Sequence, residues 1–239
     1  MVVGVGAVWL AAVVWSGAND PAASWFGALV SHGSRASDMV ALTFDDGPND
    51  SATLAVADVL TARGARGSFF LVGAAVEARP ELARQLAARG EVVGNHSFRH
   101  GRNDWLVPDY PEVRRGQVAS SGVLGRCPSF FRPPYGRHSP FTAAAAARLG
   151  LRTVTWDVNG HDWDTSDPAV IARRVMARVR PGSIVLLHDG ANGVPTADRS
   201  VLVPAVSLIL DGLATRRLRA VGLDELLGTS AWTSSCPPT

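Results

Sequence analysis

Short apolar runs typical of β-strands alternate with longer helical patterns through most of this 239-residue chain. The helical segments, such as residues 51–63 and 80–89, repeat their apolar residues with a period near 3.6, and each is followed by a glycine. Strands that alternate with helices in this way predict a parallel sheet with crossover helices. We expect seven strands, over residues 39–44, 67–72, 91–94, 129–132, 152–156, 183–187 and 217–221.

The positions of the polar residues decide between a doubly wound sheet and a barrel. Clusters of Asp, His or Arg follow the carboxyl ends of five predicted strands, at residues 45–46, 96–100, 132, 157–163 and 188–189. A cleft at a switch point draws mainly on two or three strands, whereas the rim of a barrel collects residues from many strands. The sequence therefore predicts an α/β fold, an irregular (β/α) barrel with about seven parallel strands.

The composition excludes several classes of function. All 23 basic residues are arginine, so there is no Schiff-base lysine and no lysine of a phosphate-binding P-loop. The net charge is only +2, and the arginines are scattered along helical stretches without interleaved aromatic residues. We therefore expect no nucleic-acid partner. Hydrolytic chemistry remains open.

The two ends of the chain differ from its centre. Residues 1–18 are apolar up to Trp15 and end in small residues, which predicts a signal or membrane-anchor segment and an extracytoplasmic protein, secreted or anchored. The segment lacks basic residues at its start and is short for a span of roughly 20 residues, so a buried N-terminal helix or a misplaced start codon is also compatible with it. We expect any membrane contact to be made through this segment alone.

The rest of the chain divides into a linker over residues 19–37, which are rich in Ala, Ser and Gly, one catalytic domain over residues 38–227, and a tail over residues 228–239 without periodicity. Cys127 and Cys236 could form one disulfide in an exported protein, or remain two unpaired thiols. The tail is expected to be loose unless Cys236 is tied down.

The motif TFDDGP (residues 43–48) ends the first long strand, and HSFRH (residues 96–100) follows downstream. One Asp and two His would give a divalent ion three protein ligands and leave positions open for water and substrate. Adjacent residues at a strand end point to opposite sides, so the second Asp is free to act as a base. Either motif alone is also compatible with an ordinary turn or a surface histidine pair. Together they indicate a catalytic metal site.

Three further segments bring chemistry to the same predicted rim. FRPPYG (residues 131–136) contains a double proline that stiffens the backbone around its Arg and Tyr. WDVNGHDW (residues 156–163) supplies a carboxylate and two indoles, and indole faces suit sugar rings. LLHD (residues 186–189) places a histidine at the end of an otherwise apolar strand.

In order and approximate spacing, these five segments resemble the motifs of the NodB-type polysaccharide deacetylases, carbohydrate esterase family 4. The family motifs are TFDDGP, H-[ST]-x-x-H, R-P-P-Y, D-x-x-D-W and L-x-H, and the resemblance covers roughly residues 38–225. It implies a NodB-type barrel and a metal-dependent hydrolase that removes N-acetyl or O-acetyl groups from an acetylated glycan. One position departs from the pattern, because Asn159 stands where the family often has Asp.

The resemblance also implies roles for the residues that match. Asp46, His96 and His100 would hold a divalent metal, commonly zinc in this family, with cobalt, nickel or manganese as alternatives. Asp45 would be the general base, held in place by Arg132.

On the other side of the site, the resemblance makes His188 the general acid, oriented by Asp162, and assigns the backbone N–H of Tyr135 to the oxyanion. The residues expected to line the substrate pocket are Trp163, Leu186 and Pro133.

Several readings of the activity remain open at this point. An N-acetylhexosamine-containing polysaccharide such as peptidoglycan or a chitin-like oligosaccharide is the expected substrate. An acetylxylan-type esterase could use the same machinery, and a catalytically inactive carbohydrate-binding homologue could keep the aromatic rim. A cytosolic amidase would fit if the first 18 residues were part of the folded domain. We expect a monomer.

Overall fold

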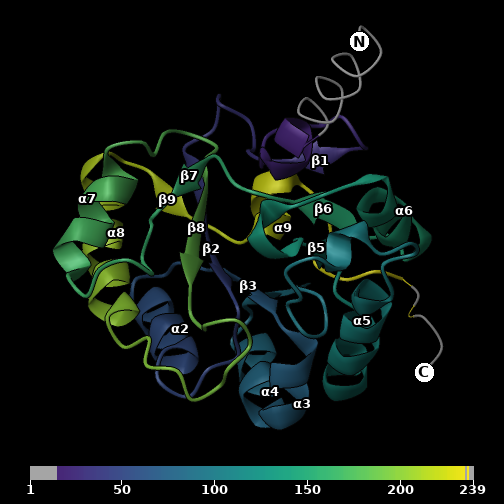
Figure 1. The fold of residues 1–239 in the computed structure, drawn as a ribbon. Coiled ribbons are helices and arrows are strands. Elements are labelled where there is room, and N and C mark those ends of the chain that lie inside the picture. Colours follow the sequence, from purple (N-terminus) through teal and green to yellow (C-terminus); the bar gives the residue numbers. More distant parts are fainter. Residues whose placement is uncertain (1–14, 235, 237–239) are drawn as a thin grey trace, which may run out of the picture.

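The computed structural model describes residues 15–234 and 236 (Figure 1). Its sheet runs in the order β1-β6-β5-β4-β3-β2-β8-β7, with β9 paired to β2, and every pairing is parallel. The strands are β1 (Leu29–Val30), β2 (Met39–Asp45), β3 (Ser68–Leu71), β4 (Val92–Asn95), β5 (Phe130–Phe131), β6 (Arg152–Val154), β7 (Val158–Asn159), β8 (Ile184–His188) and β9 (Arg219–Ala220).

The sheet curves into an irregular barrel because one stretch of chain pairs on both of its sides. β6 pairs with β5, and after a gap of three residues β7 pairs with β8. β8 in turn pairs with β2. The same stretch of chain therefore contributes strands near both ends of the sheet, and the barrel stays open between β6 and β7, which do not pair. The predicted irregular barrel is therefore confirmed. β1 and β7 were not predicted, because each has only two residues and neither has a strand pattern of its own.

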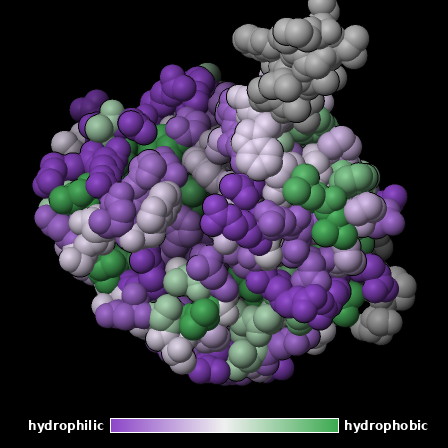
Figure 2. All heavy atoms as spheres, in the orientation of Figure 1, coloured by the Kyte–Doolittle hydropathy of each residue, from purple (hydrophilic) through white to green (hydrophobic). Residues whose placement is uncertain are grey.

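Helices surround the strands on the outside (Figure 1). α2 packs on α4 and α8, α5 packs on α3 and α4, and α7 packs on α8. The helices are α2 (Thr53–Ala62), α3 (Gly73–Ala78), α4 (Pro80–Ala88), α5 (Pro111–Leu124), α6 (Pro140–Arg148), α7 (Pro168–Met176), α8 (Leu202–Thr215) and α9 (Leu223–Leu227), with short 3-10 turns at Asp104–Leu106 and Pro134–Gly136. The face in Figure 2 is mostly hydrophilic, with apolar residues in small separate groups, so the large apolar residues lie mainly in the core.

Alternation along β2 explains how a polar residue reaches the inside of the barrel. Val40, Leu42 and Phe44 belong to the apolar core shared with the outer helices, whereas Ala41 belongs to a separate cluster with interior residues of other strands. Because successive side chains of a strand point to opposite faces, Asp45 falls on the same face as Ala41. The strand therefore carries the carboxylate of its last residue, Asp45, into the barrel at the rim.

The N-terminal predictions meet the structure only in part. Residues 1–14, which carry most of the predicted signal or anchor segment, lie outside the described residues. Within the described part of the chain, no helix has both the length and the apolar character needed to cross a membrane. The segment predicted as a linker contributes β1, and its Arg35 forms an ion pair of 2.7 Å with Asp157. Its Ala/Ser/Gly composition did not reveal this pairing, because the edge of β6 supplies the strand partner.

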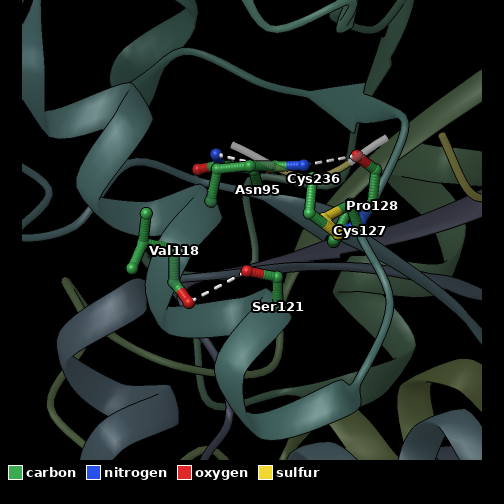
Figure 3. The surroundings of a disulfide bond; sticks show 7 residues. Asn95, Val118, Ser121, Cys127, Pro128 and Cys236 are labelled. Atoms are coloured by element: carbon green, nitrogen blue, oxygen red, sulfur yellow. Dashed lines mark hydrogen bonds between the residues drawn. A yellow bond between two sulfur atoms is a disulfide. The ribbon is translucent and has the colours of Figure 1, made fainter. Parts of the chain in front are cut away.

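The described residues of the C-terminal segment, 228–234 and 236, are tied to the barrel. Cys236 forms a disulfide with Cys127, next to the strand β5 (Figure 3). Ser129 N–H donates a hydrogen bond of 3.0 Å to the carbonyl oxygen of Ala231. Of the two alternatives for the cysteines, the structure has the disulfide.

We predict that loss of this disulfide destabilises the protein. It closes a loop with a sequence separation of 109 residues, so replacing Cys236 by Ser should lower the free energy of unfolding by about 2–4 kcal/mol. Urea unfolding with and without reductant measures the effect. The double variant C127S/C236S is the control, because reductant should not lower its stability further. Equal stability of the oxidised protein and the variant would contradict the prediction.

Candidate active site

A cavity of about 530 Å³ opens at the carboxyl ends of the strands, where the sequence placed the site. Four of the nine non-glycine residues with a positive φ in the described chain line it: Asp46, His100, Tyr135 and Asn192. Such conformations cost free energy and cluster at functional sites. The residues that line the cavity are Asp45, Asp46, His96, His100, Tyr135, Trp156, Asn159, Trp163, Leu186, His188, Gly190, Ala191, Asn192 and Arg199.

The structure brings Asp46, His96 and His100 together as a possible metal-binding group. One ligand atom from each residue lies within 4.8 Å of the others. Oδ1 of Asp46 is 3.0 Å from Nε2 of His100 and 3.5 Å from Nε2 of His96. The three residues are buried.

The hydrogen bonds around this group leave its inner atoms free. The N–H of Asn192 donates to Oδ2 of Asp46 at 2.8 Å, whereas Oδ1 of Asp46 is buried without a hydrogen-bond partner. His96 donates from Nδ1 to the carbonyl oxygen of Arg132 at 2.7 Å, which leaves the lone pair of its Nε2 for a ligand. A buried oxygen without a donor is costly, so these atoms fit a divalent cation bound by two nitrogens and one oxygen.

The protonation states suit a cation at this point. Burial, together with the neighbouring His96, lowers the pKa of His100 to about 4, so its imidazole is neutral at neutral pH. Burial alone would raise the pKa of Asp46, but the neighbouring imidazoles of His96 and His100 hold it below the usual value. A neutral imidazole and an ionised carboxylate are the forms that bind metals.

Asp45 lies beside this group in a fixed orientation. Its Oδ1 accepts a hydrogen bond of 2.7 Å from Nη1 of Arg132, which also donates to Oγ1 of Thr43 at 2.8 Å. The Arg132 side chain is fully buried and lies over the ring of Phe70 at 4.1 Å. Oδ2 of Asp45 lies 3.7 Å from Nε2 of His96. One oxygen of Asp45 is therefore held by Arg132, and the other lies next to the possible metal site.

His188 lies at the end of the strand next to Asp45, and the two residues are partners in the parallel register of β2 and β8. The ring Nδ1 of His188 is 2.9 Å from Oδ1 of Asp162, and the backbone N–H of His188 donates to Oδ2 of the same carboxylate at 3.0 Å. Burial acts to lower the pKa of His188, but the charge and hydrogen bond of Asp162 raise it to about 9. The imidazole is therefore protonated at neutral pH.

Tyr135 lies in a tight turn that follows Arg132. Its φ of 60° places it in the left-handed region, in the turn Pro134–Gly136. The hydrogen bonds of the turn come from the N–H groups of Gly136 and Arg137, which donate to Pro133 and Pro134, and the N–H of Tyr135 takes no part in them. The Tyr135 ring lies 4.7 Å from the His100 ring, so the turn borders the possible metal site.

The predicted pocket residues are only partly on the cavity wall. Leu186 and Trp163 line it, and Trp163 is half exposed, with its ring edge-on to His188 at 5.1 Å. Pro133 is buried and does not line the cavity. The reason is that the turn directs Tyr135, rather than the proline ring, to the cavity.

Several residues that line the cavity were missed by the sequence analysis. Asn192 and Arg199 come from the loop between β8 and α8, and no motif marks that loop. Trp156 is one of the two indoles of the WDVNGHDW motif, but only the other indole, Trp163, was expected to line the pocket. Loop residues of this kind carry no periodic signal, so the sequence offered no means of finding them.

Comparison with known proteins gives consistent results. The polysaccharide deacetylase family model matches residues 32–154. A chitooligosaccharide deacetylase of Bradyrhizobium sp. (strain ANU 289) is 34% identical over 203 residues, which cover 78% of this chain and 90% of that protein. The peptidoglycan-N-acetylglucosamine deacetylase PgdA of Listeria monocytogenes is 30% identical over 191 residues, which cover 79% of this chain and 39% of PgdA.

A solved structure agrees with the fold as well. The crystal structure of the Bc1960 peptidoglycan N-acetylglucosamine deacetylase superposes with a TM-score of 0.79 at 29% identity, covering 85% of this chain and 94% of the other. The chain belongs to the polysaccharide deacetylase family, and the family predicted from the motifs is confirmed.

We predict that metal content distinguishes Asp45 from the residues that would hold the metal. His96→Ala removes one of three ligands and should leave the purified protein with little bound metal, whereas Asp45→Asn should keep a metal content near that of the wild type. Elemental analysis after incubation with zinc and dialysis measures both, and circular dichroism checks that the variants fold. Loss of metal in D45N together with retention in H96A would contradict the grouping of Asp46 with the histidines.

Proposed function

We propose that this protein is a metal-dependent deacetylase that hydrolyses N-acetyl groups of an N-acetylhexosamine-containing polysaccharide, such as peptidoglycan or a chitin-like oligosaccharide. The observation that carries this proposal is one cavity that is lined by a possible metal group, a carboxylate held by an arginine and an imidazole paired with a buried aspartate. The names of the relatives, deacetylases of chitooligosaccharides and of peptidoglycan, support the same substrate class.

Asp46, His96 and His100 would hold the divalent ion, for which zinc is our first choice and cobalt, nickel or manganese are alternatives. When bound, such an ion polarises the acetyl carbonyl and lowers the pKa of a water molecule. The remaining chemistry belongs to the side chains and backbone around the cavity.

Asp45 acts as the general base. It removes a proton from the water molecule that attacks the carbonyl carbon, and Arg132 keeps its carboxylate in place during that transfer. The charge that develops on the carbonyl oxygen receives a hydrogen bond from the N–H of Tyr135, which the turn holds in position before the reaction.

His188 acts as the general acid. The bond between the acetyl carbon and the nitrogen breaks as Nε2 of His188 gives its proton to that nitrogen, so acetate and a free amine leave the site. Asp162 holds Nδ1 of the ring and thereby directs the other ring nitrogen to the cavity. The exposed face of Trp163 and the side chain of Leu186 would contact the sugar and the acetyl methyl.

We further propose that the protein acts outside the cytoplasm, secreted or anchored through its N-terminal segment. Polymeric substrates of the proposed class lie in cell walls, and a disulfide such as that between Cys127 and Cys236 persists in oxidising compartments. Fractionation of cells that produce the protein tests this location. Recovery of the full-length protein from the cytosol alone would contradict it.

The pH dependence follows from the role of His188. A general acid must carry its proton, and the pKa of His188 is about 9, so kcat/KM should fall as the pH rises through about 9. Replacing Asp162 by Asn removes the charge that raises this pKa and should move the alkaline limb to lower pH. Rates measured from pH 5 to pH 11 test the prediction. An alkaline limb that does not move in D162N would contradict the assignment of His188.

Acetate release from defined glycans tests the function itself. The wild type with added zinc or cobalt should release acetate from chitin oligosaccharides or peptidoglycan fragments, and a chelator should stop release reversibly without unfolding the protein. D45N should lose at least about 100-fold in kcat, because it lacks the base. Acetylated xylan is the comparison substrate for an esterase. No release from any glycan would overturn the proposed function.

A further inference from the structure

Besides the protonated His188 ring, a second cation, Arg199, contacts the His188–Asp162 pair. Arg199 lies in the loop between β8 and α8, and its side chain is 12% exposed. Its Nε donates to the carbonyl oxygen of His188 at 3.1 Å, and its Nη2 donates to Oδ2 of Asp162. One guanidinium therefore binds both the main chain of the proposed acid and the carboxylate that orients it.

The position of Arg199 is itself fixed by the segment that follows the TFDDGP motif. Its backbone N–H donates to Oγ of Ser51 at 2.9 Å, and that hydroxyl donates to Oδ1 of Asn49 at 2.7 Å. Asn49 comes directly after the motif that carries Asp45 and Asp46. The loop with Arg199 thus connects the acid side of the cavity to the side with the base.

The charge balance of Asp162 explains what this contact does. Asp162 is fully buried, and a buried carboxylate without a counter-charge is strongly unfavourable. While His188 is protonated, the imidazolium supplies the counter-charge. Once His188 has given its proton to the leaving group, Arg199 still balances Asp162. Without Arg199, release of the proton would leave a buried unpaired anion, and the ring would hold its proton more tightly.

The other charged groups around His188 do not replace this contact. Asp45, Asp46 and His100 act on its ring through space from the cavity side, and the two aspartates favour the charged ring, as Asp162 does. The Trp163 ring lies in a T-shaped arrangement with the His188 ring and carries no charge. Among the described residues, Arg199 is the cation that pairs with Asp162 besides the His188 ring itself.

We propose that Arg199 is a positioning residue for the general acid: it holds Asp162 and the main chain of His188 so that the imidazole faces the cavity and can release its proton. This inference rests on the proposed function and deepens it. It predicts a defect confined to reactions whose leaving group needs a proton.

The test compares two leaving groups. An amine leaves only with a proton, whereas the aryloxide of 4-nitrophenyl acetate leaves without one. Arg199→Met should lower kcat for the N-acetyl glycan about 10- to 100-fold, less than the full contribution of a general acid, and change the aryl ester rate less than about threefold. R199K should recover part of the loss, because an ammonium can balance Asp162 but cannot also bind His188 in the same geometry.

Two variants serve as references. H188N defines the signature of a missing acid, with a large loss on the glycan and a small loss on the ester. R174M is the matched control, because Arg174 donates to the carbonyl oxygen of His161 and pairs with Asp164 in the neighbouring loop without contacting Asp162. It should behave as the wild type. If R199M matches the wild type on the glycan while H188N is inactive, the inference is wrong and the proposed function stands.

A spectroscopic measurement tests the inference without any turnover. Nitrogen-15 NMR of the histidine rings should show the Nδ1 proton of His188, assigned by its absence in H188N, as a slowly exchanging signal in the wild type. In R199M the ring nitrogens of His188 should stay in the protonated form to a higher pH than in the wild type, because Asp162 has lost its second counter-charge, while R174M titrates as the wild type does. An unchanged titration of His188 in a folded R199M would overturn the inference even if the wild type released acetate from no glycan, a result that would separately overturn the proposed function.

Discussion

The buried contact between Arg132 and Asp45 is the interaction on which the site depends. The guanidinium lies inside the barrel with no exposure and contacts β2 through Asp45 and Thr43, and it donates to carbonyl groups at the end of β6. The backbone carbonyl oxygen of Arg132 accepts a hydrogen bond from Nδ1 of His96. One residue thus orients the carboxylate beside the possible metal site through its side chain and one of the ligands through its main chain. Removing it would leave a buried unpaired carboxylate, which is costly.

The parallel sheet determines where the proposed base and the proposed acid lie. Asp45 and His188 are register partners at the ends of neighbouring strands, so the backbone pairing of β2 and β8 fixes the distance between them. The loops beyond the strands supply the rest of the site, and there the backbone takes the strained conformations seen at Asp46, His100 and Tyr135. Rigid strands position the proposed base and acid, whereas strained loops shape the possible metal group and the turn that contains Tyr135.

Much of the fold and of the site could be predicted, for different reasons. The strands with four or more residues have strong apolar patterns, so β2, β3, β4 and β8 were expected within two residues of their bounds. β1 and β7 are too short to produce a pattern and exist because neighbouring strands offer them hydrogen bonds. The possible metal group was predicted because its Asp and its two His lie in short motifs with the residue types that bind metals. Arg199 and Asn192 were not found, because they act through contacts to residues more than ten positions away or through a main-chain N–H.

The sequence by itself determined the alternation of strands and helices, the polar clusters at strand ends and the family to which the motifs belong. These features are local, since hydrophobic periodicity and short motifs depend on residues close together in the chain. Only the tertiary structure decided that residues 152–159 supply two strands, β6 paired with β5 and β7 paired with β8. It alone also decided that Cys127 pairs with Cys236 and that Arg199 contacts Asp162. Such contacts join segments far apart in the sequence, and their partners become neighbours only when the barrel forms.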